Sequence, residues 1–222
     1  RSFIGVVPGR CRGRIEDSHY KAAFQSAHKR ITMDKTVLSA QDLLEDSIEL
    51  GIKVLESGFE PTMIIAIWRG GTPVGMALQE TLSYCGVTSD HIAIRTSSYT
   101  GVDQRGHVAV HGLNYIIKKI CHDDRVLIVD DVFDTGNTIK AVIDELRRRA
   151  RDNTPEDIRV AVPWFKPSRN ETDLSPDFFL RETAEWLVFP HELDALTPEE
   201  LERHRPGIAE IVHRIKSPAL PD

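Results

Sequence analysis

The chain has 222 residues, a formal net charge of −6 and three cysteines that are far apart in the sequence. This length fits one α/β domain with a sizeable core. The acidic balance argues against broad nucleic-acid binding, and the cysteine spacing matches neither a metal site nor a disulfide framework. No apolar run approaches the roughly 20 residues needed to cross a membrane, and the N-terminus lacks a signal-peptide pattern. We therefore expect a cytoplasmic protein without a nucleic-acid or membrane partner.

Strand and helix patterns alternate along the chain, after an N-terminal tail or extension that we assign to residues 1–38. Residues 39–222 are interpreted as a single domain. Ser39 is a candidate cap for the first helix, which Gly58 would end. The expected strands are 62–68, 91–99, 125–129, 158–165 and a short one at 185–189. The expected helices are 40–58, 75–86, 137–150 and 197–215. The polar stretch 100–110 is interpreted as a hairpin-like excursion, and 166–179 as irregular.

This alternation predicts an α/β fold with a parallel sheet covered by helices on both faces. In such sheets, ligands bind beside the carboxyl ends of the strands. Two unusual loops follow expected strands, "WRGG" (68–71) and "DDVFDTGNT" (130–138). We therefore expect these two loops to be neighbours at one edge of the sheet.

The second loop combines acidic residues with features that bind phosphate. Gly136 permits backbone conformations that other residues resist, and Thr135 and Thr138 offer hydroxyl donors. The N-terminus of the following helix adds unpaired N–H groups and a positive dipole end. Asp130 and Asp131 suit such a pocket only if the ligand also carries hydroxyl groups or a metal ion. A sugar phosphate meets both conditions, whereas a single aspartate here would more simply cap a helix.

The whole stretch "VLIVDDVFDTGNT" resembles the phosphoribosyl-pyrophosphate signature of type I phosphoribosyltransferases. The resemblance implies their fold, a mostly parallel central sheet flanked by helices, with a small hood for the base formed largely by residues 164–195. It also implies that Asp130 and Asp131 contact the ribose hydroxyls. The residues that would form the 5'-phosphate loop are Asp134, Thr135, Gly136, Asn137 and Thr138.

Further stretches resemble the 6-oxopurine branch of the family. "IIAIWRGGTPVG" is similar to its pyrophosphate loop, which implies contacts from Arg69 and Gly70, often through a non-proline cis peptide bond. Lys166 in "VAVPWFKPS" matches the lysine that donates to the purine 6-oxo group. Trp186 in "ETAEWLVFPHELD" matches the aromatic residue that stacks on the base, and the Leu187 backbone would address the purine edge. Taken one at a time, without the resemblance, "RGG" would be interpreted as a plain turn, Lys166 as a surface lysine and Trp186 as a core tryptophan.

The remaining implied roles concern the mobile loop and the metal. Ser98 and Tyr99 occupy the place of the flexible catalytic loop, although the rest of that loop matches loosely. Mg²⁺ is the implied cofactor. Glu192, or alternatively Asp194, would lie near the ion beside the pyrophosphate, and Asp130 would contact the ion together with the ribose hydroxyls. The long, charged segment 167–185 departs from the family pattern and bears on which base is preferred.

The resemblance implies a purine salvage enzyme that joins a 6-oxopurine to the ribose of phosphoribosyl pyrophosphate and expels pyrophosphate. Asp134 is then the catalytic candidate, because the family aspartate at this place faces N7 of the base. The sequence does not rank hypoxanthine, guanine and xanthine. Two alternatives stay open, a non-catalytic regulator of the same fold and an enzyme for another base. The family forms dimers and tetramers, so we expect a homodimer or homotetramer.

Overall fold

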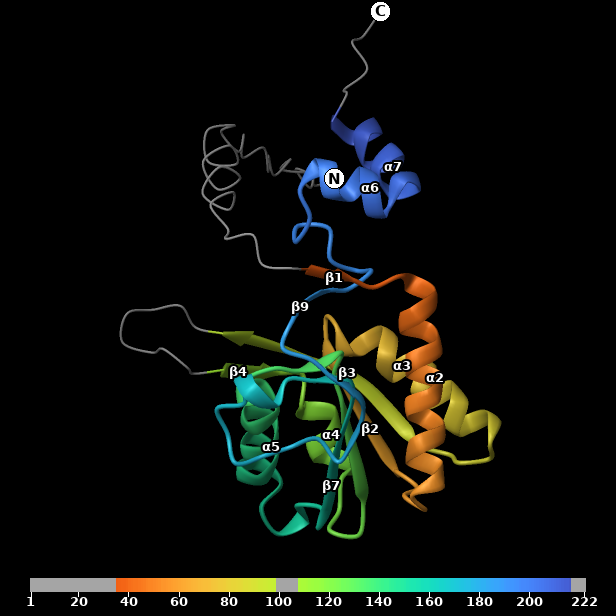
Figure 1. Ribbon diagram of the computed structural model, residues 1–222. Helices are drawn as coiled ribbons and strands as arrows, with labels where there is room; N and C mark the ends of the chain where they lie inside the picture. Colours follow the sequence, from red (N-terminus) through yellow and green to blue (C-terminus); the bar gives the residue numbers. More distant parts are fainter. Residues whose placement is uncertain (1–34, 99–107, 217–222) are drawn as a thin grey trace, which may run out of the picture. The chain divides into compact units, whose positions relative to one another are not determined.

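The computed structural model describes residues 35–98 and 108–216, and its centre is a seven-stranded sheet (Figure 1). The strand order is β4-β3-β2-β5-β7-β6, and β8 also pairs with β7. Only the β3–β4 pair is antiparallel within this sheet. The strands are β2 (Met63–Trp68), β3 (Asp90–Ser98), β4 (Val108–His111), β5 (Arg125–Val129), β6 (Val132–Phe133), β7 (Asp157–Phe165) and β8 (Phe178–Glu182). The expected mostly parallel sheet is confirmed.

Two helical layers cover the sheet, α2 and α3 on one face and α4 and α5 on the other (Figure 1). The strands supply both cores, because successive side chains of a strand point to opposite faces. In β5, Val126 and Ile128 pack toward α4 and α5, whereas Leu127 and Val129 pack toward α2 and α3. These helices are α2 (Ala40–Glu56), α3 (Gly71–Tyr84), α4 (Asn114–Lys119) and α5 (Asn137–Ala150).

A second, two-stranded sheet joins the start of the described chain to the expected hood. Strand β1 (Lys35–Val37) runs parallel to β9 (Trp186–Val188), and Thr36 is opposite Leu187. The chain after β9 is held by Arg205, whose guanidinium donates to backbone carbonyls of this segment, including that of Phe189 at 2.9 Å. Two short helices follow, α6 (Pro198–His204) and α7 (Pro206–Lys216).

Local chemistry explains where the first helix begins. Ser39 caps α2 through a reciprocal pair of hydrogen bonds with Asp42, so the predicted cap is confirmed. Residues 35–37, which the sequence assigned to the N-terminal extension, form β1 and belong to the same folded unit as α2.

Several element boundaries differ from the expected ones. Helix α3 begins at Gly71 rather than at residue 75, and Phe178–Glu182 is a strand where the sequence suggested irregular structure. The helical stretch 197–215 is two helices, because Pro206 lacks the N–H that a continuous helix needs. None of the helices in the described part of the chain is long and apolar enough to cross a membrane.

Candidate active site

The acidic pair stands where β5 ends, at the carboxyl edge of the sheet. The Asp131 amide donates to Asp130 Oδ1 at 3.0 Å, which turns the first carboxylate back toward the chain. Burial raises the pKa of Asp130 well above its usual range, and the negative charge of Asp131 raises it further. Two carboxylates that repel each other in a partly buried place are costly unless a ligand uses them, so the pair has the character of a binding site.

Two glycines bring the loop after β2 into contact with this pair. A Cβ atom added to Gly70 would lie 1.9 Å from Asp131 Oδ2, and one added to Gly71 would lie 2.4 Å from the Val129 carbonyl oxygen. Gly71 therefore accepts no side chain, because backbone atoms face it, whereas a side chain at Gly70 would displace the Asp131 carboxylate. The peptide bond between Trp68 and Arg69 is cis, as the resemblance implied, and Arg69 is exposed. The two loops are neighbours, as the sequence predicted.

The expected phosphate loop encloses a cavity of about 200 Å³ at the N-terminus of α5. Gly136 has a φ of 80°, a left-handed conformation that favours glycine. Its backbone lets the loop turn so that the first N–H groups of α5 lie next to the cavity. The side chains and backbone that line it belong to Asp130, Asp131, Val132, Phe133, Asp134, Thr135, Gly136, Thr138 and Ile139.

Residues of the segment 167–185 brace the outer side of this loop. Glu171 donates its amide to the Thr135 carbonyl at 3.0 Å and accepts from Asn137 Nδ2 at 2.8 Å. A Cβ atom on Gly136 would lie 2.5 Å from Thr172 Oγ1, which shows how closely the two segments approach. Asn137, predicted as a phosphate-loop residue, therefore directs its side chain to Glu171.

On the base side of the site, Asp134 meets two cationic side chains. Lys166 is 4% exposed, and its Nζ atom lies 3.7 Å from Asp134 Oδ2. Arg169 places Nε 2.6 Å from Asp134 Oδ1, a close ion pair that lacks the alignment of a hydrogen bond. The Lys166 ammonium also lies 5.9 Å from the centre of the Trp186 ring, within cation–π range. Three predicted base-site residues thus converge, and Lys166 is not a surface lysine.

The hood reaches the acidic pair through His191. Its Nε2 atom lies 3.3 Å from Asp131 Oδ2, and its ring stacks on Phe189 with centroids 5.6 Å apart. Glu192, the expected metal-side carboxylate, accepts a hydrogen bond from the Phe189 amide at 3.1 Å. The rival, Asp194, is exposed. The metal role of either residue stays a prediction.

The positions of three other predicted site residues do not test their predicted roles. The Leu187 side chain is buried, and its strand pairs with β1, so the part that its backbone would play at a purine edge stays a prediction. Ser98 ends β3 opposite Val108. Tyr99 lies outside the described residues.

Sequence reasoning missed Arg169 and His191. Arg169 follows Lys166 by three residues and reaches Asp134 because residues 167–169 form a 3-10 turn. His191 stands in the "FPHELD" stretch, but no periodic pattern indicates a partner that is 60 positions away in the chain. A histidine next to the expected hood strand was the only available signal.

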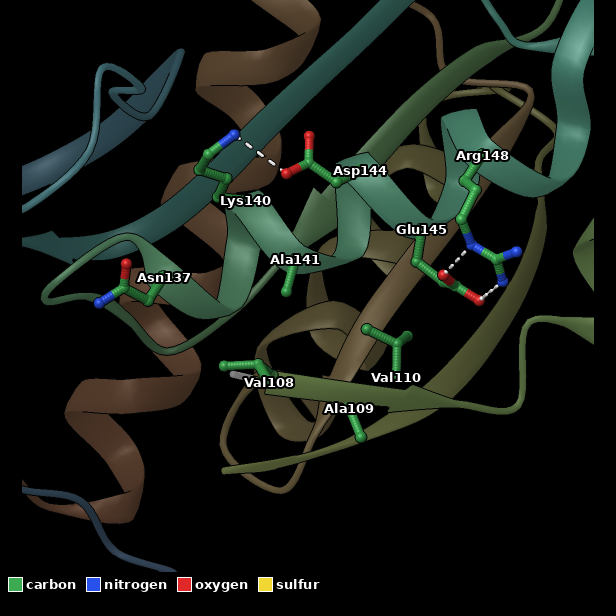
Figure 2. Close-up of a pocket in the computed structure, with 9 residues that line it drawn as sticks. All are labelled: Val108, Ala109, Val110, Asn137, Lys140, Ala141, Asp144, Glu145 and Arg148. Carbon is green, nitrogen blue, oxygen red and sulfur yellow. Dashed lines mark hydrogen bonds and ion pairs between the residues drawn. The ribbon is translucent and has the colours of Figure 1, made fainter. Parts of the chain in front are cut away.

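A larger cavity of about 530 Å³ lies between β4 and α5 (Figure 2). Its charged side chains pair with one another, Lys140 with Asp144 and Arg148 with Glu145 (Figure 2). They are therefore not directed together at a ligand. Since the smaller cavity has the adjacent carboxylates of Asp130 and Asp131, the loop glycine and the N-terminus of α5, we place the chemistry there.

Comparison with known proteins agrees with this arrangement of sheet, phosphate loop and acidic pair. Residues 34–196 match the phosphoribosyl transferase domain. The chain therefore belongs to the type I phosphoribosyltransferase family, as the signature implied.

Particular relatives come from bacteria and archaea. A hypoxanthine/guanine phosphoribosyltransferase of Methanocella arvoryzae is 33% identical over 47% of this chain and 53% of its own length, so the alignment spans about half of that protein. A hypoxanthine-guanine phosphoribosyltransferase of Lactococcus lactis is 24% identical over 66% of this chain and 75% of its own length. The crystal structure of a purine phosphoribosyltransferase from Pyrococcus horikoshii has a TM-score of 0.58 at 28% identity, over 72% of this chain and 95% of the other.

Proposed function

We propose that this protein is a 6-oxopurine phosphoribosyltransferase. It would transfer the 5-phosphoribosyl group from phosphoribosyl pyrophosphate to hypoxanthine, guanine or xanthine, giving the nucleoside 5'-monophosphate and pyrophosphate. The observation that carries the proposal is the 3.7 Å approach of the buried Lys166 ammonium to Asp134. It joins the sugar-phosphate signature to a cation suited to a 6-oxo acceptor. The names of the relatives from Methanocella and Lactococcus support the same substrate class.

In this proposal the sugar is held between the phosphate loop and the acidic pair. The 5'-phosphate would occupy the cavity at the start of α5, where Thr135, Thr138 and backbone N–H groups supply donors. Asp130 and Asp131 would accept hydrogen bonds from the two ribose hydroxyls. Such a held sugar supplies the orientation that a displacement at C1 needs.

The leaving pyrophosphate would lie beside the loop after β2. The exposed Arg69 and the Gly70 backbone supply positive charge and donors there, which would stabilise the charge that develops as the bond to C1 breaks. A chain with a negative net charge can bind a polyanion in this way, because positive groups next to the ligand neutralise its charge locally.

We propose Mg²⁺ as the cofactor, brought in with the substrate. Within residues 35–98 and 108–216, no group of three or more His, Cys, Asp or Glu side chains could hold a metal ion. Mg²⁺ commonly binds through one or two carboxylates plus substrate phosphates, and Asp130 and Asp131 fit that smaller requirement. When bound, the ion would neutralise pyrophosphate charge.

The base would stack on Trp186 and direct its 6-oxo group to Lys166. Asp134 would face N7 of the purine and take up its proton, with Arg169 holding the carboxylate at its other edge. A lysine donor suits an oxo group better than the amino group of adenine. The cytoplasmic location and the homodimeric or homotetrameric assembly stay predictions.

The test is a set of turnover measurements on the purified chain with Mg²⁺ and phosphoribosyl pyrophosphate. Hypoxanthine, guanine, xanthine and adenine are supplied separately, and nucleotide formation is followed by absorbance, with a reaction lacking base as the control. Turnover with an oxopurine and not with adenine is expected. Saturable binding of the sugar pyrophosphate without turnover of any base would instead indicate a regulator of the same fold. Turnover with adenine alone would indicate an enzyme for another base.

A further inference from the structure

A histidine of the hood contacts the acidic pair and is not among the residues that the signature contributes. His191 Nε2 lies 3.3 Å from Asp131 Oδ2, within the distance of an ion pair or a long hydrogen bond. Asp131 has a relative side-chain exposure of 13% and His191 of 25%, so water screens the contact only in part.

The surroundings of the imidazole favour one direction for its donor. Nδ1 is buried and has no hydrogen-bond partner among the described residues. A buried N–H without a partner costs more than a buried lone pair of a ring nitrogen, so the proton belongs on Nε2, facing Asp131. The ring is held there by its stacking on Phe189, with an interplanar angle of 14°.

Asp131 is therefore held from two sides. Gly70 faces Oδ2 so closely that a Cβ atom would overlap it, and His191 approaches the same oxygen from the hood. This contact confines the carboxylate to one orientation and leaves the lone pairs of Oδ1 for a ligand hydroxyl. The segment from Trp186 to His191 thereby joins the base-stacking ring to the ribose-facing carboxylate.

We propose that His191 is a positioning residue for the ribose site, and that it acts by directing Asp131 toward the sugar hydroxyls of phosphoribosyl pyrophosphate. This inference rests on the proposed function, because the ligand that Asp131 would meet is the sugar of that substrate. A side chain that holds a ligand-binding group in position before the ligand arrives reduces the conformational entropy lost on binding. Its loss should therefore raise the Kd and the KM for the sugar pyrophosphate and change kcat little.

The experiment compares four full-length proteins, the unmodified chain, His191→Leu, His191→Gln and His122→Leu. Leucine removes the donor, whereas glutamine keeps an N–H that can reach Asp131. His122 is the matched control, because its Nε2 atom also faces a carboxylate, Glu156 Oε1 at 3.1 Å, but at the opposite end of β5. Calorimetry gives the Kd for phosphoribosyl pyrophosphate with Mg²⁺, initial rates give KM and kcat, and thermal melting checks folding.

His191→Leu is expected to raise the Kd and the KM about tenfold, close to the lower end of what one hydrogen bond to a charged group contributes, with kcat within about threefold. His191→Gln should recover most of the loss, and His122→Leu should match the unmodified chain. Equal losses in His191→Leu and His191→Gln would overturn the inference, because they would assign the effect to packing of the ring. If the unmodified chain binds and turns over phosphoribosyl pyrophosphate, and His191→Leu has the same Kd and KM, this inference alone would be overturned. An unmodified chain that neither binds the sugar pyrophosphate nor turns over would refute the proposed function and this inference with it.

Discussion

Replacing Gly70 by alanine should remove the ribose site while leaving the fold intact. The residue has φ −64° and ψ −39°, which any L-residue adopts, so the backbone accepts the change. The new Cβ atom would lie 1.9 Å from Asp131 Oδ2, and ordinary contact begins near 3.4 Å, so the carboxylate must move by about 1.5 Å. Because the obstacle is the end of a side chain, the free energy of unfolding should change by less than about 1 kcal/mol.

The main expected effect of Gly70→Ala is weaker binding of the proposed ligand. A displacement of that size breaks the hydrogen bond between Asp131 and a sugar hydroxyl, worth about 2 kcal/mol for a charged acceptor, or about thirtyfold in Kd. Calorimetry with phosphoribosyl pyrophosphate and Mg²⁺ measures it. Gly207→Ala serves as the control, because a Cβ atom there meets nothing within 4 Å. An unchanged Kd in Gly70→Ala would refute the reasoning, since Asp131 would then not be the group that meets the sugar.

Three further predictions concern charged side chains. Asp134→Asn should lower kcat about a hundredfold with little change in the KM for the sugar pyrophosphate, and steady-state rates showing full activity would remove Asp134 from the mechanism. In the folded state the pKa of Asp130 is raised above its ordinary 3.8, so the folded chain holds a proton that the unfolded chain releases. Stability should therefore fall as the pH rises from 3.8 through the raised value, and Asp130→Asn should lack this dependence and be more stable than the unmodified chain at pH 7 in urea unfolding. Arg181 pairs with Asp46, which is 6% exposed, and Arg181→Leu should cost about 2 kcal/mol by leaving that charge unpaired, so an unchanged urea midpoint would contradict this assignment.

Short-range patterns predicted the sheet, but they could not predict its late strand. The buried strands read as continuous apolar runs because both of their faces are covered. Strand β8 lies at an edge, is five residues long and follows a stretch rich in Asp, Ser and Pro. Its existence depends on pairing with β7, where Phe178 is opposite Ala161. A pairing between residues this far apart in the sequence produces no periodic pattern of apolar residues that could predict it.

The start of α3 at Gly71 was predicted too late in the chain, at residue 75, for a related reason. Glycine disfavours a helix interior, so propensity places the start later. The approach of the loop to Val129 and Asp130 requires a residue without a side chain at this place and overrides the propensity. In the site, the signature residues were predictable because they are consecutive, whereas the contact of His191 with Asp131 exists only once the hood has folded.

The bracing of the phosphate loop by Glu171 and Thr172 has a consequence for engineering. These residues follow Lys166 closely in the chain, so the segment that would read the base also supports the loop that would hold the sugar phosphate. Under the proposed function, a library that varies residues 166–172 to accept a new base would also alter affinity for the shared ribosyl donor. Variants selected for base choice should therefore be screened at several donor concentrations, and compensating changes are best sought in Asn137 on the facing side of that contact.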